Sequence, residues 1–149
     1  MNPASLIEEQ TAYYRARAEE YDEWFLRIGR YDRGEQHRSQ WTNELDSIRS
    51  FISRNAPLGD TLEIACGTGL WTGSLAALAD SLTALDSVEE TIELNQQKNA
   101  TSKIDYIVAD AFEWEPADRF DTIFFGFWLS HVPESHFENF WAKIGDALK

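Results

Sequence analysis

Two glycines, Gly67 and Gly69, follow a short apolar strand and precede a helical stretch within Thr61–Thr72. Glycine has no Cβ, so the backbone here can turn sharply and lie against a ligand, with N–H groups at the helix start available as donors. Asp86 ends the next predicted strand, seventeen positions after Gly69. In a doubly wound sheet, a carboxylate at that place faces the hydroxyl groups of a ribose. The spacing predicts a nucleoside site; the alternative is that Asp86 caps the helix beginning near Val88.

The chain around these residues alternates between short apolar strands and helical stretches. The predicted strands are Leu62–Ala65, Leu82–Leu85, Ile104–Val108 and Thr122–Phe127, and the predicted helices are Leu70–Ala79, Val88–Asn99 and Ser135–Leu148. Strands separated by helices of this length favour parallel pairing through right-handed crossovers. The pattern therefore predicts an α/β fold with a doubly wound, mostly parallel sheet.

Two helices are expected before the sheet. Ser5 followed by Glu8 has the form of a capping box, and the absence of Pro and Gly from there to about Ile28 predicts one long helix, ended by Gly29. A second helix is expected over about Glu35–Ser53, because its apolar residues recur at spacings of three and four.

The length of 149 residues fits a single domain, with residues 1–54 as a helical cap and residues 60–149 as the core. The formal charge of -13 would repel phosphate backbones, so no nucleic-acid partner is expected. The single cysteine, Cys66, excludes an intrachain disulfide and suits a loop-packing role. Because neither a leader segment nor an apolar run long enough for a bilayer is present, we expect a cytoplasmic protein with no membrane partner.

The segment Leu62–Gly69 resembles the first motif of class I S-adenosylmethionine-dependent methyltransferases, which is an acid followed by three alternating glycines. Ala65 stands where that family has its first glycine. The resemblance covers about Tyr13–Lys149. It implies a Rossmann-like sheet with strand order 3-2-1-4, S-adenosylmethionine as cofactor and S-adenosylhomocysteine as product. It also implies in-line methyl transfer to an O, N or C acceptor on a small molecule.

The same resemblance assigns roles to residues after each strand. Asp86 matches the acid that binds the ribose, and Asp110–Phe112 matches the segment that binds adenine. Glu63 is expected to hold the glycine loop or the methionyl amino group; its alternative is a structural hydrogen bond to the loop amides. The alternatives for Asp110 and Phe112 are a helix cap and a core residue. The predicted cofactor-binding residues are Tyr14, Arg17, Glu63, Ala65, Gly67, Gly69, Asp86, Ser87, Asp110, Ala111, Phe112 and Phe127. No metal site is predicted.

The stretch Phe127–Pro133 is expected to face the transferable methyl group, because ligands bind beyond the carboxyl ends of parallel strands. Within it, His131 is the candidate general base for a hydroxyl or amine acceptor. The alternative is that His131 packs locally, since methyl transfer from an activated sulfonium often needs only correct positioning and exclusion of water. His136 is interpreted as a surface residue.

The N-terminal helix resembles the one that covers the cofactor in many small-molecule members of the family. Tyr13, Tyr14 or Tyr21 would shield the site, and Arg17 would meet the methionyl carboxylate. The alternative is an amphipathic helix that packs its aromatic residues on the sheet. No internal repeat is expected, and the recurrence of Tyr-Asp at Tyr21 and Tyr31 is interpreted as coincidental.

Two other functions remain open. A nicotinamide-dependent oxidoreductase shares the fold, but Thr72 stands where its fingerprint needs a third small residue, and Trp71 is bulky near the pyrophosphate position. A catalytically incomplete binding module or a truncated fragment is the other, because the family continues for three more strands. The strand Thr122–Phe127 would then lie at the sheet edge with apolar residues on both faces, so a homodimer or a second chain completing the sheet is expected.

Overall fold

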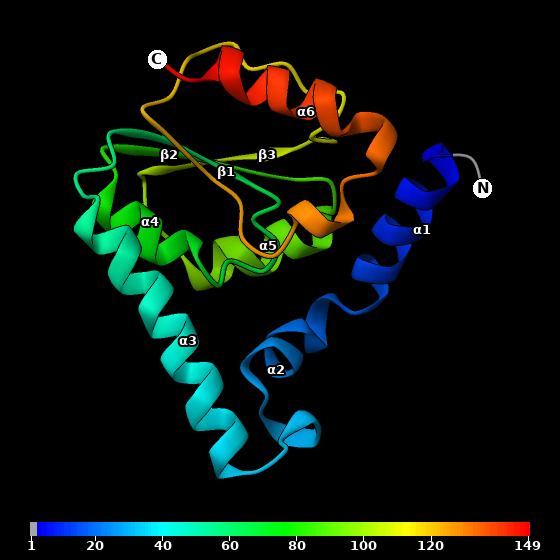
Figure 1. Cartoon of the computed structure of the whole chain (residues 1–149), viewed down its shortest axis with the longest axis vertical. Helices are drawn as coiled ribbons and strands as arrows, with labels where there is room; N and C mark the ends of the chain where they lie inside the picture. The colour runs from blue at the N-terminus through cyan, green and yellow to red at the C-terminus, as the bar shows by residue number, and fades with distance from the viewer. Residues whose placement is uncertain (1–2) are drawn as a thin grey trace.

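Four parallel strands form the centre of the computed structural model, which describes residues 3–149 (Figure 1). The strands are β1 (Asp60–Ile64), β2 (Ser81–Asp86), β3 (Ile104–Val108) and β4 (Thr122–Phe124). Their order is β3-β2-β1-β4, which confirms the predicted topology. All three pairings are parallel, so the four carboxyl ends lie at one edge. β4 is shorter than predicted: its pairing with β1 ends at Glu63 and Phe124, and Phe127 then leaves the extended conformation with a φ of 57°.

Helices cover both faces of the sheet, as the predicted doubly wound fold requires (Figure 1). One face carries α4 (Thr72–Leu78) and α5 (Glu89–Lys98), and the other carries α6 (Glu134–Ala147). Alternation along the strands sorts the side chains between two apolar clusters. Leu62 and Ile64 pack in the cluster that includes α6, whereas Leu82 and Ala84 pack in the cluster that includes α4 and α5.

The N-terminal segment differs from the predicted single helix. It contains α1 (Pro3–Ala16), a 3-10 turn η1 (Ala18–Glu20), the short helix α2 (Tyr21–Leu26) and a second turn η2 (Gly29–Tyr31). The prediction of one helix to about Ile28 is wrong: the chain bends at Arg17 and again at Arg27, which has a φ of 56°. The bends are stabilised by tertiary packing, because α2 turns Phe25 into the core at 5% exposure. α1 begins at Pro3, so Ser5 lies in its first turn instead of at its N-cap.

The long helix α3 (Glu35–Arg54) confirms the second predicted helix and ends within one residue of it. Its Trp41 indole donates to the Phe25 carbonyl at 2.6 Å, and the Arg27 guanidinium lies 4.3 Å from the Trp41 ring centroid. Leu45 and Ile52 of α3 are buried in the same cluster as α4. α3 therefore connects the N-terminal helices to the sheet.

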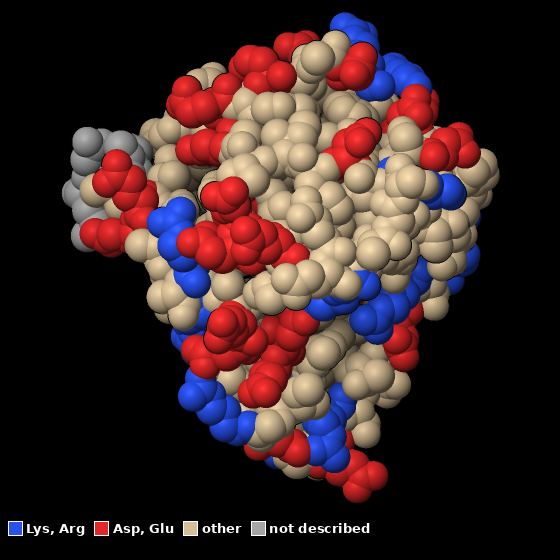
Figure 2. Space-filling view, turned by 180° about the vertical axis from the view of Figure 1, so that it is seen from behind, with Lys and Arg blue, Asp and Glu red and all other residues tan. Residues whose placement is uncertain are grey.

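Charged side chains of both signs are present on the face of the molecule that is seen from behind in Figure 2. Figure 2 shows acidic and basic groups mixed over the face seen from behind, with an uncharged area in its upper half. None of the helices in residues 3–149 has the length and apolar character needed to cross a membrane.

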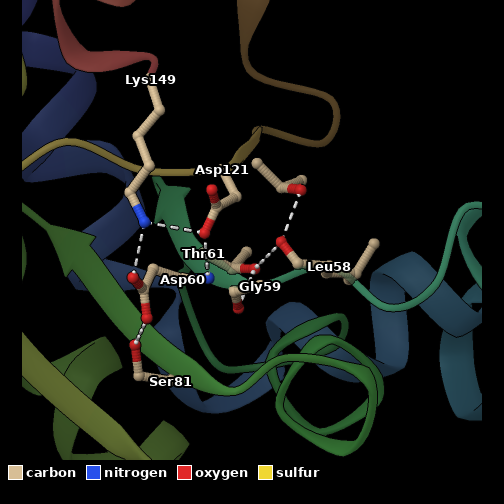
Figure 3. Close-up of polar contacts among 8 residues, drawn as sticks. Leu58, Gly59, Asp60, Thr61, Ser81, Asp121 and Lys149 are labelled. Atoms are coloured by element: carbon tan, nitrogen blue, oxygen red, sulfur yellow. Dashed lines mark hydrogen bonds and ion pairs between the residues drawn. The ribbon is translucent and has the colours of Figure 1, made fainter.

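The last residues pack beside β4 at the end of the sheet opposite the carboxyl ends. Leu148 forms a parallel bridge with Phe120, whose carbonyl accepts from the Lys149 N–H at 3.0 Å. The Lys149 ammonium lies 2.8 Å from Asp60 Oδ2 and 2.9 Å from Asp121 Oδ2 (Figure 3). These bonds hold the pKa of both carboxyls below their ordinary values. β4 was predicted to be an open edge strand. The segment just before it is partly paired with the last residues of the chain.

Candidate functional site

A cavity opens at the carboxyl ends of the strands, where ligands bind in open α/β sheets. It encloses about 1060 Å³ of empty space, including its open mouth. The loops after all four strands contribute to its wall, together with residues of α1, α2, α5 and the end of β2. Ten predicted residues share this one cavity: Tyr14, Ala65, Gly67, Asp86, Ser87, Asp110, Ala111, Phe112, Phe127 and His131.

The loop after β1 turns through three residues with positive φ: Ala65 at 56°, Gly67 at 51° and Gly69 at 88°. A Cβ added at Gly67 would meet no atom, so this position faces open space in the cavity wall. Gly69 faces the other way, and a Cβ there would collide with the side-chain amides of Asn95 and Asn99. The predicted residue Gly69 therefore shapes the loop from behind and does not line the cavity.

Asn95 of α5 holds this loop through a buried amide that is 0% exposed. Its Nδ2 donates to the Gly67 carbonyl at 3.2 Å, and its Oδ1 accepts from the Tyr106 hydroxyl at 2.9 Å. Asn99, one turn later, donates to the Gly69 carbonyl at 3.1 Å and to Asn95 Oδ1 at 2.9 Å. Both glycine carbonyls are thus bonded by the side-chain amides at the end of α5. The sequence analysis missed these two asparagines.

Glu63 lies behind the loop and outside the cavity. It is 1% exposed and accepts a hydrogen bond from the Thr72 hydroxyl at 2.7 Å. Burial raises the pKa of Glu63 to about 8; the Asp86 charge adds to this shift and the Thr72 hydroxyl opposes it. One of the two expectations for Glu63 was a structural hydrogen bond, and such a bond is present. Its partner is the Thr72 hydroxyl of α4 and not a loop amide.

The Asp86 carboxylate joins the glycine loop to the segment that leads into α5. Its Oδ2 accepts from the Gly67 N–H at 2.8 Å and its Oδ1 from the Val88 N–H at 2.9 Å. Burial raises the pKa of Asp86, while the bonds from Val88 and Gly67 oppose that shift. Each oxygen keeps lone pairs beyond the ones used here, so the carboxylate can accept further donors from the cavity. Asp86 therefore accepts the capping bond from the Val88 N–H and also lines the cavity.

The turn after β3 presents Asp110, Ala111 and Phe112 to the cavity. Asp110 Oδ1 accepts from the Phe112 N–H at 2.8 Å. The Phe112 ring stacks on Trp128, with centroids 5.5 Å apart and 28° between the planes. His136 contacts the outer side of Phe112 with centroids 5.0 Å apart and is not part of the cavity wall.

The helix α1 contacts the end of the 3-10 turn η3 (Leu129–His131), and both elements contribute residues to the cavity wall. The Tyr14 hydroxyl lies 3.0 Å from His131 Nε2, and the two rings meet edge to face. Burial raises the pKa of Tyr14, and burial raises that of Tyr21, which also lines the cavity, to about 12. Tyr13 is 53% exposed and lies outside the cavity.

Arg17 is not brought to the cavity, contrary to the expectation that it meets a ligand carboxylate. Its guanidinium donates to the Tyr31 hydroxyl at 2.9 Å and to Glu20 at 3.1 Å, and it also contacts Tyr13. The bend of the chain at Arg17 places this cluster on the outer side of the N-terminal helices.

Several cavity residues were missed by the sequence analysis. Ile7, Gln10 and Thr11 line the cavity together with Tyr14, and their spacing of three and four marks one face of α1. That spacing was the signal available in the sequence. Phe25 and Trp71 also belong to the wall, and both rings contact Phe127.

Asp22 is a further residue whose importance the sequence analysis missed. Its carboxylate accepts from the Thr68 hydroxyl in the glycine loop and pairs with the Lys98 ammonium of α5. Tyr21 enters the cavity, while Asp22 connects α2 to the loop beneath it.

Cys66 lines the cavity but is not activated as a nucleophile. Burial, together with the nearby Glu63 and Asp86 carboxylates, raises the pKa of its thiol, which keeps the thiol protonated. In the described part of the chain, no three His, Cys, Asp or Glu side chains are grouped in a way that would hold a metal ion.

Comparison with known proteins agrees with this geometry. Residues 61–149 match the family model described as "Methyltransferase domain". A demethylmenaquinone methyltransferase of Bacillus licheniformis is 36% identical over 86 residues, which cover 54% of this chain and 37% of that protein. A second demethylmenaquinone methyltransferase, from Staphylococcus aureus, is 33% identical over 78 residues and 32% of its length. The chain thus spans about a third of the length of these curated relatives.

Solved structures show the same fold. The DhpI–SAH complex superposes with a TM-score of 0.79 at 38% identity, covering 97% of this chain and 64% of that one. Phosphoethanolamine N-methyltransferase 1 of Haemonchus contortus, at 19% identity, also gives a TM-score of 0.79. The Rossmann-like sheet, the glycine turn after β1 and the matched residues 61–149 lead to one conclusion: the chain belongs to the methyltransferase domain family.

Proposed function

We propose that this chain binds S-adenosylmethionine in the cavity and contributes to transfer of its methyl group to an O, N or C atom of a small molecule, leaving S-adenosylhomocysteine. The main observation in support is that Asp86 and the turn at Gly67 share one wall of a cavity at the carboxyl edge of a parallel sheet. DhpI, 38% and 36% identical in two complexes, was solved with SAH and with SAM and HEP, which supports the same cofactor here.

The residues of the cavity fit such a cofactor. Asp86 would accept from the ribose hydroxyls, and Asp110 would accept from the adenine amine while Phe112 covers the ring edge. The open space beside Gly67 suits the amino-acid part. The aromatic rings of Phe127 and Tyr14 would face the sulfonium, which aromatic faces attract. The cofactor supplies an activated methyl group; the protein binds, orients and excludes water.

We also propose that His131 removes the acceptor's proton. Its Nε2 is held by the Tyr14 hydroxyl at 3.0 Å, which fixes the ring beside the cavity. For this step the Nε2–H would donate to the Tyr14 oxygen, so that the lone pair of Nδ1 is free. The proton would pass from the acceptor hydroxyl or amine to Nδ1 as the methyl carbon leaves the sulfur and bonds to the acceptor atom. The variant His131→Ala should then lower turnover without weakening SAH binding, whereas loss of both together would indicate a packing role.

Calorimetric titration with S-adenosylhomocysteine tests the main proposal. Asp86→Asn should weaken binding by about tenfold or more, because a charge-assisted contact is lost. Asp105→Asn, at an exposed site on β3, is the matched control and should bind like the unaltered protein. Binding of NADH in place of S-adenosylhomocysteine would contradict the proposal. Binding without any methyl transfer would identify a catalytically incomplete module.

For the whole molecule, we propose one cytoplasmic domain in which residues 1–54 cap a core of residues 60–149. The contact of Tyr14 with His131 supports the capping role.

We further propose that a second chain, in the simplest case another copy, pairs along β4 beyond the Phe120–Leu148 bridge, since β4 is an edge strand with half-buried apolar side chains. Light scattering after size exclusion tests this, and a monomer at every concentration would contradict it.

A further inference from the structure

Lys143 of α6 places its ammonium among backbone carbonyls of the turn after β3. Its Nζ lies 2.6 Å from the Trp114 carbonyl, 2.8 Å from that of Phe112 and 3.4 Å from that of Ala111. The side chain is only 16% exposed, and it also meets Glu115 at 3.3 Å. One cation therefore gathers the carbonyls on the α6 side of this turn.

The opposite side of the same turn faces the cavity. Asp110, Ala111 and Phe112 line the wall there. The turn closes on itself through three bonds: Asp110 Oδ1 accepts from the Phe112 N–H at 2.8 Å, and the Asp110 carbonyl accepts from the Trp114 N–H at 2.8 Å and from the Glu113 N–H at 3.1 Å. These bonds set the curvature of the turn. Its position relative to the sheet is held at its start by the Ala109 N–H, which donates to the Asp86 carbonyl at 2.9 Å, and on its outer side by Lys143.

We infer that Lys143 is a positioning residue for adenine recognition: by gathering these carbonyls it sets where the Asp110 carboxylate and the Phe112 ring stand in the cavity. The inference rests on the proposed function, since it assumes that this turn contacts the adenine. Charge-assisted bonds to carbonyls are stronger than neutral ones, so removing the ammonium leaves the turn without its main outer support.

Lys103 offers a matched control within the same chain. Its ammonium also donates to backbone carbonyls, those of Ala79 at 3.0 Å and Ala76 at 3.5 Å. It precedes β3 and binds the end of α4, so it lies at the amino ends of the strands, away from the cavity. Loss of Lys103 should therefore affect stability without affecting the adenine subsite.

The test compares Lys143→Met, Lys143→Arg and Lys103→Met by calorimetric titration at a temperature where circular dichroism shows all of them folded. The ligands are S-adenosylhomocysteine and S-inosylhomocysteine, which carries an oxygen in place of the adenine amine. The unaltered protein should prefer the adenine ligand. Lys143→Met should weaken its binding about tenfold and bring the preference near unity. Lys103→Met should keep both affinity and preference, and Lys143→Arg, which retains donors, should recover part of the preference.

An unchanged preference in Lys143→Met overturns the inference, as does an equal loss in Lys143→Met and Lys103→Met, which would show a purely structural effect. If Lys143→Met does not fold, Lys143→Arg is measured in its place. A preference for the adenine ligand lower than that of Lys103→Met supports the inference, and an equal preference overturns it. Failure of the unaltered protein to bind either ligand overturns the proposed function itself and is recognised before any variant is measured.

Discussion

Ala65 and Glu63 are residues whose types fit their surroundings poorly. Ala65 takes a φ of 56°, a conformation in which a Cβ crowds the backbone. Glu63 places a carboxyl at 1% exposure beside the glycine loop. Residues held in unfavourable states concentrate at functional sites, where the surrounding structure maintains them. Both residues adjoin the loop that forms the cavity wall. The free energy that each one costs the folded protein can be measured by substitution.

Ala65→Gly should raise the free energy of unfolding by about 0.5–1 kcal/mol. Relief of the left-handed alanine exceeds the extra entropy that glycine gives to the unfolded chain. Urea denaturation measures the change. Ala84→Gly in the middle of β2 is the control and should be destabilising, because that position is extended and fully buried. A loss of stability in Ala65→Gly would show that the methyl group contributes packing that outweighs the strain.

Glu63→Gln should flatten the pH dependence of stability. The folded-state pKa of Glu63 is about 8 against an ordinary value of 4.5, so the folded protein keeps a proton that the unfolded chain releases. The free energy of unfolding should therefore fall as pH rises from about 4.5 to about 8 and then level off. Over this pH range, the free energy of unfolding of the variant should rise by a few kcal/mol relative to that of the unaltered protein. Denaturation curves between about pH 5 and about pH 9 test this; parallel profiles would contradict it.

Among the elements, α5 does more than cover one face of the sheet. Asn95 and Asn99 hold the carbonyls of the glycine loop, Lys98 pairs with Asp22 of α2, and Glu90 pairs with Arg15 of α1. One helix thereby connects the loop, the N-terminal helices and β3. Displacement of α5 would change the cavity wall on several sides at once.

Asn95→Ala should lower the free energy of unfolding by about 2–3 kcal/mol, because the Tyr106 hydroxyl and the Gly67 carbonyl both lose a buried partner. It should also weaken binding of S-adenosylhomocysteine. Asn55→Ala is the control: this exposed amide at the end of α3 donates only to the Phe51 carbonyl. Equal effects of the two substitutions in urea denaturation would mean that the Asn95 network does not support the loop.

At the scale of the whole molecule, the charge is divided unequally. Residues 60–149 contain 16 acidic and 5 basic side chains, whereas residues 1–54 contain 10 acidic and 8 basic ones. The cavity wall includes two carboxylates, Asp86 and Asp110, and no Lys or Arg of the described residues lines it. A field of this sign favours a cationic ligand over a neutral one of the same shape.

The ratio of the affinities for S-adenosylmethionine and S-adenosylhomocysteine should therefore depend on salt. The sulfonium carries a charge that the thioether product lacks, and added ions screen its attraction to the core. We expect the ratio to fall about twofold to threefold between ~20 mM and ~500 mM sodium chloride in calorimetric titrations. A ratio independent of salt would show that only short-range contacts distinguish the two ligands.

Much of this arrangement was predictable from the sequence, because it follows from local patterns. The period of apolar residues predicts the strands and helices, and the spacing of Gly67 and Asp86 predicts where two parts of the cavity wall meet. The resemblance to a known family supplies the strand order. These features depend on residue type and on short-range spacing, both of which are visible in one dimension.

Only the tertiary structure decides the rest, because the contacts concerned join residues far apart in the chain. The bend at Arg17 depends on burial of Phe25 and on the Asp22–Thr68 bond, which bridges 46 positions, and it leaves Arg17 outside the cavity. Tyr14 meets His131 across 117 positions. Such contacts depend on how whole elements pack, and their energies are not encoded in the periodicity of any single segment.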